Sequence, residues 1–245
     1  MDRDLRRPLR LVGRPAFALR TDRRTGLRPH LSAMKYPDER AQVVAAGRQM
    51  LQRGFTEGTS GNVSMRVDEG ALITPSSVPY MEITPADVVL MDLDGNVIEG
   101  ERVASVEHKV HLECYKRRSN VGAVIHSHPI VGSIFAAART PLPAFLDEFG
   151  VYIGEEVRVA EWGLSGTSEI ADQVADALGE HNAAFIASHG MVAVGRDLDH
   201  ALLNTARVER AGLIFLGTKL LGGPGEIPDH ARDLYRQVFT YFQSR

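Results

Sequence analysis

Apolar positions in this chain follow two spacings, one typical of helices and one of strands. Between residues 38 and 53 they recur every three or four residues, behind Asp38 as a cap, which predicts a helix ending at Arg53-Gly54. The same spacing predicts helices over 106–118 (with Ser105 as the cap), 130–138, 168–178, 199–221 and 229–242. Short apolar runs predict strands over 63–67, 71–74, 87–91, 121–125, 183–187 and 191–194, with a hairpin turn at 92–96.

The order of these elements indicates the fold class. Strands and helices interleave without a strict strand–helix–strand rhythm, which favours an α/β fold with one mixed or mainly antiparallel sheet flanked by helices. No internal repeat or Pro/Gly-rich linker divides residues 36–245, so we expect a single domain there.

The N-terminal segment differs from the rest of the chain. Residues 1–33 contain nine Arg, three Asp and no Lys or Glu, a local charge of about +6. We interpret residues 1–35 as an Arg-rich, disordered extension, with a targeting peptide or a working start at Met34 as the alternatives. The remaining chain carries 19 basic and 28 acidic residues, which argues against nucleic-acid binding.

Composition excludes several classes of protein. Hydrophobic residues make up 44% and charged residues 24%, as in an ordinary globular protein rather than a disordered or coiled-coil chain. No apolar run reaches 18 residues, so no membrane span is expected. Cys114 is the one cysteine, which rules out an intrachain disulfide and favours a cytoplasmic location. A metal site in this chain would therefore have to use His and carboxylate ligands.

Three histidines occupy the ends of predicted strands. His126 and His128 are two residues apart, so both imidazoles can lie on the same face, and a proline follows directly. His189 follows a second apolar strand and precedes a glycine. If these strands are neighbours, the three nitrogens form an open site for Zn²⁺ or another divalent ion. The alternative is that the pair is half-buried and satisfied by the backbone.

Two further segments carry candidate chemistry. Glu107 lies in the first turn of the predicted helix 106–118, where it is either a compensating charge for the helix dipole or a fourth ligand and base. The loop Gly58–Asn62 is rich in small and hydroxyl-bearing residues, and is either an ordinary turn or a cradle for a phosphate or carboxylate. Ser76 and Ser77 are hydroxyls that can serve the same pocket.

Taken together, these motifs resemble the class II aldolase/adducin family, typified by L-fuculose-phosphate aldolase and L-ribulose-5-phosphate 4-epimerase. The resemblance covers about residues 38–242. It rests on five elements in the family's order, which are Gly58-Thr59-Ser60-Gly61-Asn62-Val63-Ser64, Ile73-Thr74-Pro75-Ser76, Glu107, His126-Ser127-His128 and His189-Gly190.

The resemblance implies an α/β/α fold around a mostly antiparallel sheet and a homotetramer with its sites at subunit interfaces. It implies that His126, His128 and His189 bind Zn²⁺, or Mn²⁺ or another divalent ion, and that Glu107 is both a resting-state ligand and the base. Tyr241 matches a tyrosine that reaches a neighbouring subunit's site. The implied phosphate-binding positions are Thr59, Ser60, Gly61, Asn62, Ser76, Ser77 and Ser105.

The implied reaction is cleavage of a ketose 1-phosphate, such as L-fuculose 1-phosphate, to dihydroxyacetone phosphate and an aldehyde. Charge on the enediolate is neutralised by the metal acting as a Lewis acid. Glu107 handles the proton at the enediolate carbon. The expected partner is therefore a phosphorylated sugar, with no nucleic acid and no membrane.

Three positions depart from the aldolase pattern. One of the two serines that usually precede the glutamate is Val106, and Ser77 replaces a glycine. The aldolase's catalytic tyrosine aligns near Asp147, beside Glu148, and we expect Asp147 to be an acid/base group unless both are surface residues. Losing one hydroxyl weakens phosphate binding by about 1–3 kcal/mol.

These departures keep other activities open. A metal-dependent decarboxylase or sugar-phosphate 4-epimerase could use the same scaffold. A non-catalytic, adducin-like interaction module is a distant alternative, because such modules lose metal ligands and all four candidates are present here. Oxidation by Fe²⁺ held by two His and a carboxylate is a further alternative.

Overall fold

The computed structural model describes residues 34–244. The predicted extension over residues 1–35 therefore lies outside the described residues, apart from its last two positions. Of these, Lys35 is tied to the folded part: its backbone N–H donates to the Glu99 carboxylate and its ammonium pairs with Glu69 at 2.6 Å.

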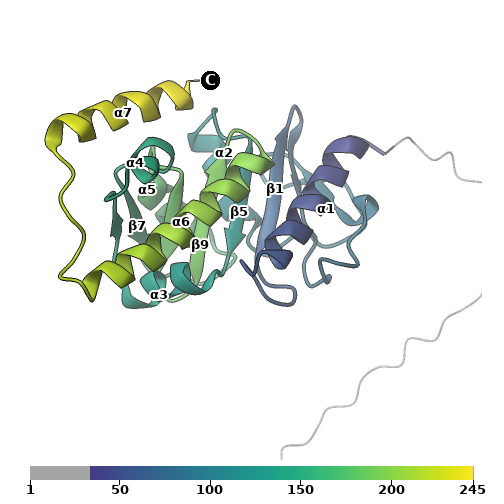
Figure 1. The fold of residues 1–245 in the computed structure, drawn as a ribbon. Coiled ribbons are helices and arrows are strands. Elements are labelled where there is room, and N and C mark those ends of the chain that lie inside the picture. The colour runs from purple at the N-terminus through teal and green to yellow at the C-terminus, as the bar shows by residue number, and fades with distance from the viewer. Residues whose placement is uncertain (1–33, 245) are drawn as a thin grey trace, which may run out of the picture. The chain divides into compact units, whose positions relative to one another are not determined.

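The described residues build one nine-stranded sheet (Figure 1). Its order is β4-β3-β2-β1-β5-β9-β8-β7-β6, and every neighbouring pair is antiparallel except β7 and β8. The prediction of a mainly antiparallel sheet is confirmed. The strands are β1 (Asn62–Val67), β2 (Gly70–Ile73), β3 (Val89–Met91), β4 (Val97–Glu99), β5 (Ala123–Ser127), β6 (Leu142–Pro143), β7 (Glu156–Ala160), β8 (Ala183–Ile186) and β9 (Gly190–Gly195).

Helices cover both faces of this sheet and make the α/β/α layers (Figure 1). One layer contains α1, α3 and α6, and the opposite layer contains α2 and α5. The helices are α1 (Pro37–Gln52), α2 (His108–Arg117), α3 (Ile130–Ala138), α4 (Asp147–Tyr152), α5 (Ser168–Leu178), α6 (Leu198–Lys219) and α7 (Asp229–Gln243), with a short 3₁₀ turn, η1 (Pro85–Asp87).

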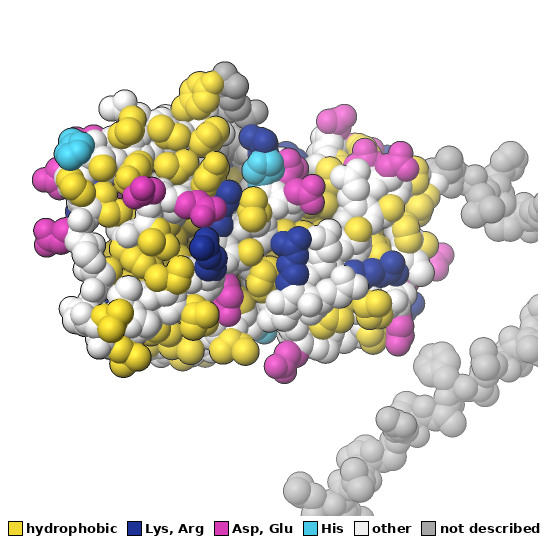
Figure 2. All heavy atoms as spheres, viewed as in Figure 1, with side chains coloured by type: hydrophobic (Ala, Val, Ile, Leu, Met, Phe, Trp, Pro, Cys, Tyr) yellow, Lys and Arg dark blue, Asp and Glu magenta, His cyan; other side chains and the backbone are white. Residues whose placement is uncertain are grey.

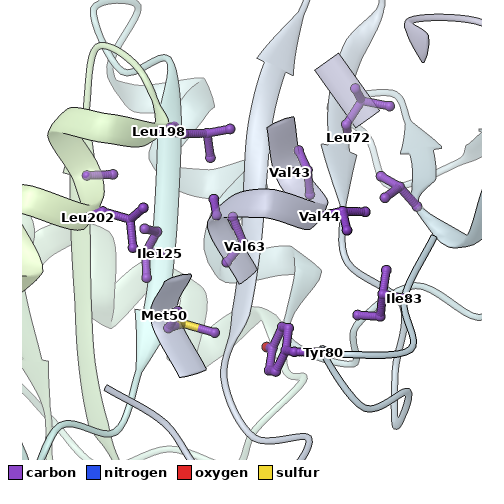
Figure 3. Close-up of a cluster of buried hydrophobic side chains, with 14 of the residues drawn as sticks. Val43, Val44, Met50, Val63, Leu72, Tyr80, Ile83, Ile125, Leu198 and Leu202 are labelled. Carbon is purple, nitrogen blue, oxygen red and sulfur yellow. The ribbon is translucent and has the colours of Figure 1, made fainter. Parts of the chain in front are cut away.

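The core follows the alternation of side chains along the strands. In β5, Ala123 and Ile125 join the cluster under α1 and α6, whereas Val124 joins the cluster under α2 and α5. Figure 3 shows the first cluster, where Val63 and Ile125 of the sheet pack against residues of α1 and α6. Because strands of the central sheet are buried on both faces, they read as continuous apolar runs rather than as alternating ones.

Some boundaries and elements differ from the prediction. The helix expected over 106–118 begins at His108, with Glu107 at the capping position, and the strand expected from residue 87 begins at Val89, after η1. The sequence does not predict β4, α4 or β7, which are short. Short segments span too few residues for a hydrophobic period to be recognised. Their structure depends on neighbours that are distant in sequence. In the described part of the chain, no helix is both long and apolar enough to cross a membrane.

Candidate metal centre and active site

The three histidines meet because the β5–β9 ladder and the β8–β9 hairpin place their ends together. His126 pairs with Val192 across the β5–β9 ladder, so the end of β5 lies beside the start of β9. Strands β8 and β9 form a tight hairpin in which Ile186 pairs with Gly190. His189 lies in the turn between them. The nearest ring nitrogens of His126, His128 and His189 all lie within 4.8 Å of one another, and the ring centroids are 4.8–5.0 Å apart.

Two glycines make this convergence possible. A Cβ on Gly61 would lie 2.7 Å from the backbone oxygen of His126, and its φ of +73° disfavours other residues. A Cβ on Gly190 would lie 2.5 Å from the imidazole of His128. The glycine after His189 is therefore a packing requirement of the site, and it lets the His128 ring lie directly over the start of β9.

Glu107, directly before α2, adds a carboxylate to the cluster. It stands at the N-cap of α2, and its carboxylate makes no capping hydrogen bond to the helix. Oε2 lies 3.2 Å from Nε2 of His126, and Oε1 lies 3.4 Å from Nε2 of His189. Asn62 donates to Oε2 at 2.8 Å, and the Ser165 hydroxyl donates to Oε1 at 3.1 Å.

Burial and neighbouring charges set the protonation of this cluster. Burial opposes ionisation of Glu107, but the hydrogen bond and charge of His126, with that of His189, outweigh it and hold the pKa of Glu107 below its usual range. Burial lowers the pKa of His128 to about 4, and also lowers the pKa of His189. At neutral pH an anionic carboxylate therefore lies near the neutral imidazoles of His128 and His189, which is the form that binds a cation.

The donor set fits a divalent metal ion. Nδ1 of His126 lies 3.0 Å from the Met191 carbonyl oxygen, which can only accept, so Nδ1 carries a proton and Nε2 is the nitrogen that would bind a metal ion. That Nε2 lies 3.0 Å from Nε2 of His128, an arrangement of two nitrogens that a shared cation satisfies. Three imidazoles and one carboxylate suit Zn²⁺ and similar ions better than Ca²⁺ or Mg²⁺, which prefer oxygen ligands.

The predicted phosphate-binding positions lie next to this cluster. Asn62 stands opposite His126 on β1, so the loop Gly58–Asn62 ends at the metal site, with Thr59 and Ser60 exposed. The segment of Ser76 and Ser77 joins the segment before Glu107 through a bridge between Pro75 and Ala104. Two of the predicted positions are already engaged: Ser105 is buried and accepts from the Glu107 N–H at 3.3 Å, and Asn62 holds the Glu107 carboxylate.

Asp147 and Tyr241 lie elsewhere in this chain. Asp147 is exposed at the start of α4, and Tyr241 is half-exposed on α7, which packs against α4. The end of β5 at the metal site leads into α3, and Figure 1 shows α3 along the lower edge and α7 along the upper edge of the described residues. A single chain therefore does not bring either residue to the histidines.

Sequence reasoning missed the groups that support Glu107. Ser165 comes from a loop between β7 and α5 that carries no recognisable motif. His111, four residues after Glu107, contacts Asn62, and a spacing of four on a predicted helix is the signal that would have placed both residues on one face.

Comparison with known proteins agrees with this geometry. Residues 41–216 match the family model described as the class II aldolase and adducin N-terminal domain. The chain belongs to this family, and the resemblance read from its motifs is confirmed.

Several relatives are named as aldolases. A 5-deoxy-D-ribulose 1-phosphate aldolase of Bacillus thuringiensis serovar kurstaki is 35% identical over 84% of this chain and 97% of its own length. An L-fuculose phosphate aldolase of Escherichia coli O6:H1 is 31% identical over 75% of this chain and 85% of its own. A solved structure of an L-fuculose 1-phosphate aldolase, 35% identical, superposes with a TM-score of 0.79 over 83% of this chain and 96% of that one. The prediction of a class II aldolase-type lyase is confirmed.

Proposed function

We propose that this protein is a divalent-metal-dependent aldolase that cleaves a ketose 1-phosphate to dihydroxyacetone phosphate and an aldehyde. The observation that carries the proposal is the convergence of His126, His128 and His189 with a Glu107 carboxylate that Asn62 and Ser165 hold in place. Zn²⁺ is the ion that this donor set suits best, with Mn²⁺ as the alternative.

A bound divalent ion would supply a Lewis acid for the substrate carbonyl and its adjacent hydroxyl. Glu107 lies beside the imidazoles of His126 and His189, so its carboxylate can exchange a proton with the substrate carbon next to the carbonyl. The exposed hydroxyls of Thr59 and Ser60, with Ser76 and Ser77, would bind the phosphate, and Asn62 would contribute its second amide hydrogen.

The surroundings of Glu107 favour a substrate with an apolar end. Val106 is 59% exposed beside Glu107, and Leu164 is 65% exposed beside Ser165, which contacts Glu107. Apolar side chains left in water at a site rim are suited to cover an apolar part of the ligand. We therefore propose that the released aldehyde ends in a methyl or another apolar group, as the 5-deoxyribulose and fuculose phosphates named for the relatives would give.

The test is release of dihydroxyacetone phosphate from a panel of ketose 1-phosphates that pairs deoxy sugars with their hydroxylated counterparts. Release that requires metal and is abolished by chelator and by His126→Ala supports the proposal. His230→Ala is the matched control, because His230 is exposed on α7. No release from zinc-loaded protein would overturn the aldolase reaction and favour the decarboxylase or epimerase, for which CO₂ evolution and epimer formation are the assays.

We further propose that the active unit is a homotetramer in which Tyr241 and Asp147 serve the site of a neighbouring subunit. Apolar side chains gather over the face crossed by α6 and at α3, where Ile130, Ile134 and Leu213 are exposed (Figure 2). A patch of this kind marks a protein contact. Mixing His126→Ala with Tyr241→Phe subunits tests the sharing: activity should exceed that of either variant alone, whereas sites built within one chain would gain nothing.

A cytoplasmic location also belongs to this proposal. It is supported by the single, buried Cys114, which forms no disulfide within the chain. Fractionation with an antibody against the protein is the direct test, and recovery from an extracellular or membrane fraction would contradict it.

A further inference from the structure

A chain of buried polar side chains runs behind Glu107, away from the metal site. Asn62, His111, Ser64 and Tyr115 are each at most 3% exposed. His111 Nε2 contacts Oδ1 of Asn62, and its Nδ1 lies 2.7 Å from the Ser64 hydroxyl. That hydroxyl lies 2.7 Å from the hydroxyl of Tyr115. The side-chain hydrogen bonds of His111, Ser64 and Tyr115 go to one another and to Asn62 rather than to the histidine cluster, so the proposed reaction does not use these three residues directly.

The direction of every hydrogen bond in this row of side chains follows from the Glu107 carboxylate, which the row meets at Asn62. Ionised Glu107 can only accept, so Asn62 must present its amide nitrogen to Glu107 and its oxygen to His111. The Nε2 of His111 must then carry a proton. Burial lowers the pKa of His111 to about 3, so the ring is neutral and its Nδ1 is an acceptor. Ser64 therefore donates to His111, and Tyr115 donates to Ser64.

The reverse arrangement has a definite cost. If His111 carried its proton on Nδ1, its Nε2 lone pair would face Asn62 and turn the amide around. The amide oxygen would then point at the Glu107 carboxylate, two acceptors at a distance where a hydrogen bond now forms. Because the chain is buried, no water can relieve this mismatch. The tautomer of His111 thus determines whether Asn62 holds Glu107 or repels it.

We propose that His111 is a positioning residue that locks the Asn62 amide so that it holds the Glu107 carboxylate at the metal site. Ser64 and Tyr115 satisfy this tautomer of His111 from behind, because each hydroxyl can donate to the next acceptor. The catalytic part of this inference rests on the proposed aldolase reaction, whereas its effect on metal binding does not.

Three substitutions separate positioning from simple packing. His111→Gln places an amide nitrogen near the former Nε2 and can still donate to Asn62. His111→Asn has the same chemistry but is one methylene shorter, so it cannot reach. His111→Leu fills the space without any donor. We expect kcat and zinc affinity to fall about 10- to 100-fold in the Leu and Asn variants, and to stay within several-fold of the wild type in the Gln variant.

The measurements are kcat and KM for dihydroxyacetone phosphate release, and the dissociation constant of Zn²⁺ alone by competition with a fluorescent chelator. Zinc affinity does not depend on the substrate, so this readout stands even if the aldolase reaction fails. Thermal unfolding of each variant reports whether it folds. Equal losses in the Gln, Asn and Leu variants, or wild-type zinc affinity in the Leu variant, would overturn the proposal.

A double-mutant cycle with Asn62→Ala tests whether His111 acts through Asn62, and it also covers the case in which one variant folds poorly. If His111 acts through Asn62, His111→Leu should cause little further loss of zinc affinity in the Asn62→Ala background, although it causes a large loss in the wild type. Additive losses in the two backgrounds would show that His111 acts by another route and would refute the positioning role.

Discussion

Two groups of polar side chains lie on either side of Glu107, and they are satisfied in opposite ways. In the open cluster of His126, His128 and His189, ring nitrogens face one another at distances at which one cation could bind all three. In the closed chain of Asn62, His111, Ser64 and Tyr115, every donor meets an acceptor. The same residue types therefore serve binding where their bonding is incomplete and rigidity where it is complete.

The largest effect on kcat should come from replacing Glu107, which joins the two groups. Glu107→Gln removes the negative charge and the proton acceptor, so kcat should fall by about 10²–10⁴-fold. Thermal stability should change little, because the carboxylate lies among groups arranged for a ligand rather than for folding. Glu169→Gln, an exposed position on α5, is the control. Retention of more than a tenth of the wild-type kcat by Glu107→Gln would contradict the assigned role.

The open cluster should also fail when its packing is disturbed without touching a ligand. Gly190→Ala places a Cβ against the His128 ring, so we expect zinc affinity to fall about 10-fold or more. Gly217→Ala on α6, where nothing lies within 4 Å of the new Cβ, should leave zinc affinity unchanged and add up to about 1 kcal/mol of stability. The chelator competition assay measures both, and similar affinities for the two variants would argue against this explanation of the glycine.

Within the closed chain, the buried His111 should make the free energy of unfolding depend on pH. The pKa of His111 is about 3 in the folded protein and about 6.5 when unfolded, so the unfolded chain binds a proton first as pH falls. Stability present above pH 6.5 is thus lost on acidification, by about 1.5 kcal/mol between pH 6.5 and pH 5 for this one proton.

Urea unfolding of metal-free wild type and His111→Gln, at one protein concentration, measures this contribution. The other histidines are common to both proteins, so the difference between their pH slopes isolates His111. We expect the shallower slope in the variant. Parallel curves would mean that His111 is already charged in the folded protein and would contradict the hydrogen-bond directions derived for the closed chain.

The smallest effect is expected at the far end of the closed chain. Tyr115→Phe removes one donor to Ser64 and should cost about 1 kcal/mol of unfolding free energy, with little change in zinc affinity. Tyr235→Phe is the matched control, because its hydroxyl bonds Asp147 on the surface and should contribute nearly nothing. A loss of stability no larger than that of the control would show that the hydrogen bond between Tyr115 and Ser64 does not stabilise the fold.

Much of the fold and part of the site could be predicted from local pattern. The periodicity of residues 38–53, the strand ending in His126 and the helix after Glu107 are encoded by neighbours in sequence, and they appear within a few residues of the expected bounds. The pair His126 and His128 was recognisable because a spacing of two fixes their common face.

The sequence by itself determined which ligands the protein can offer and the class of sheet that carries them. Only the tertiary structure decided that the β8–β9 hairpin brings His189 to His126, that Ser165 reaches Glu107, and that Asn62 is held by His111. Periodicity is a property of adjacent residues, so a sequence displays it directly. The meeting of side chains 49 to 63 positions apart depends on strand order and register, which follow from how all the apolar faces are buried together.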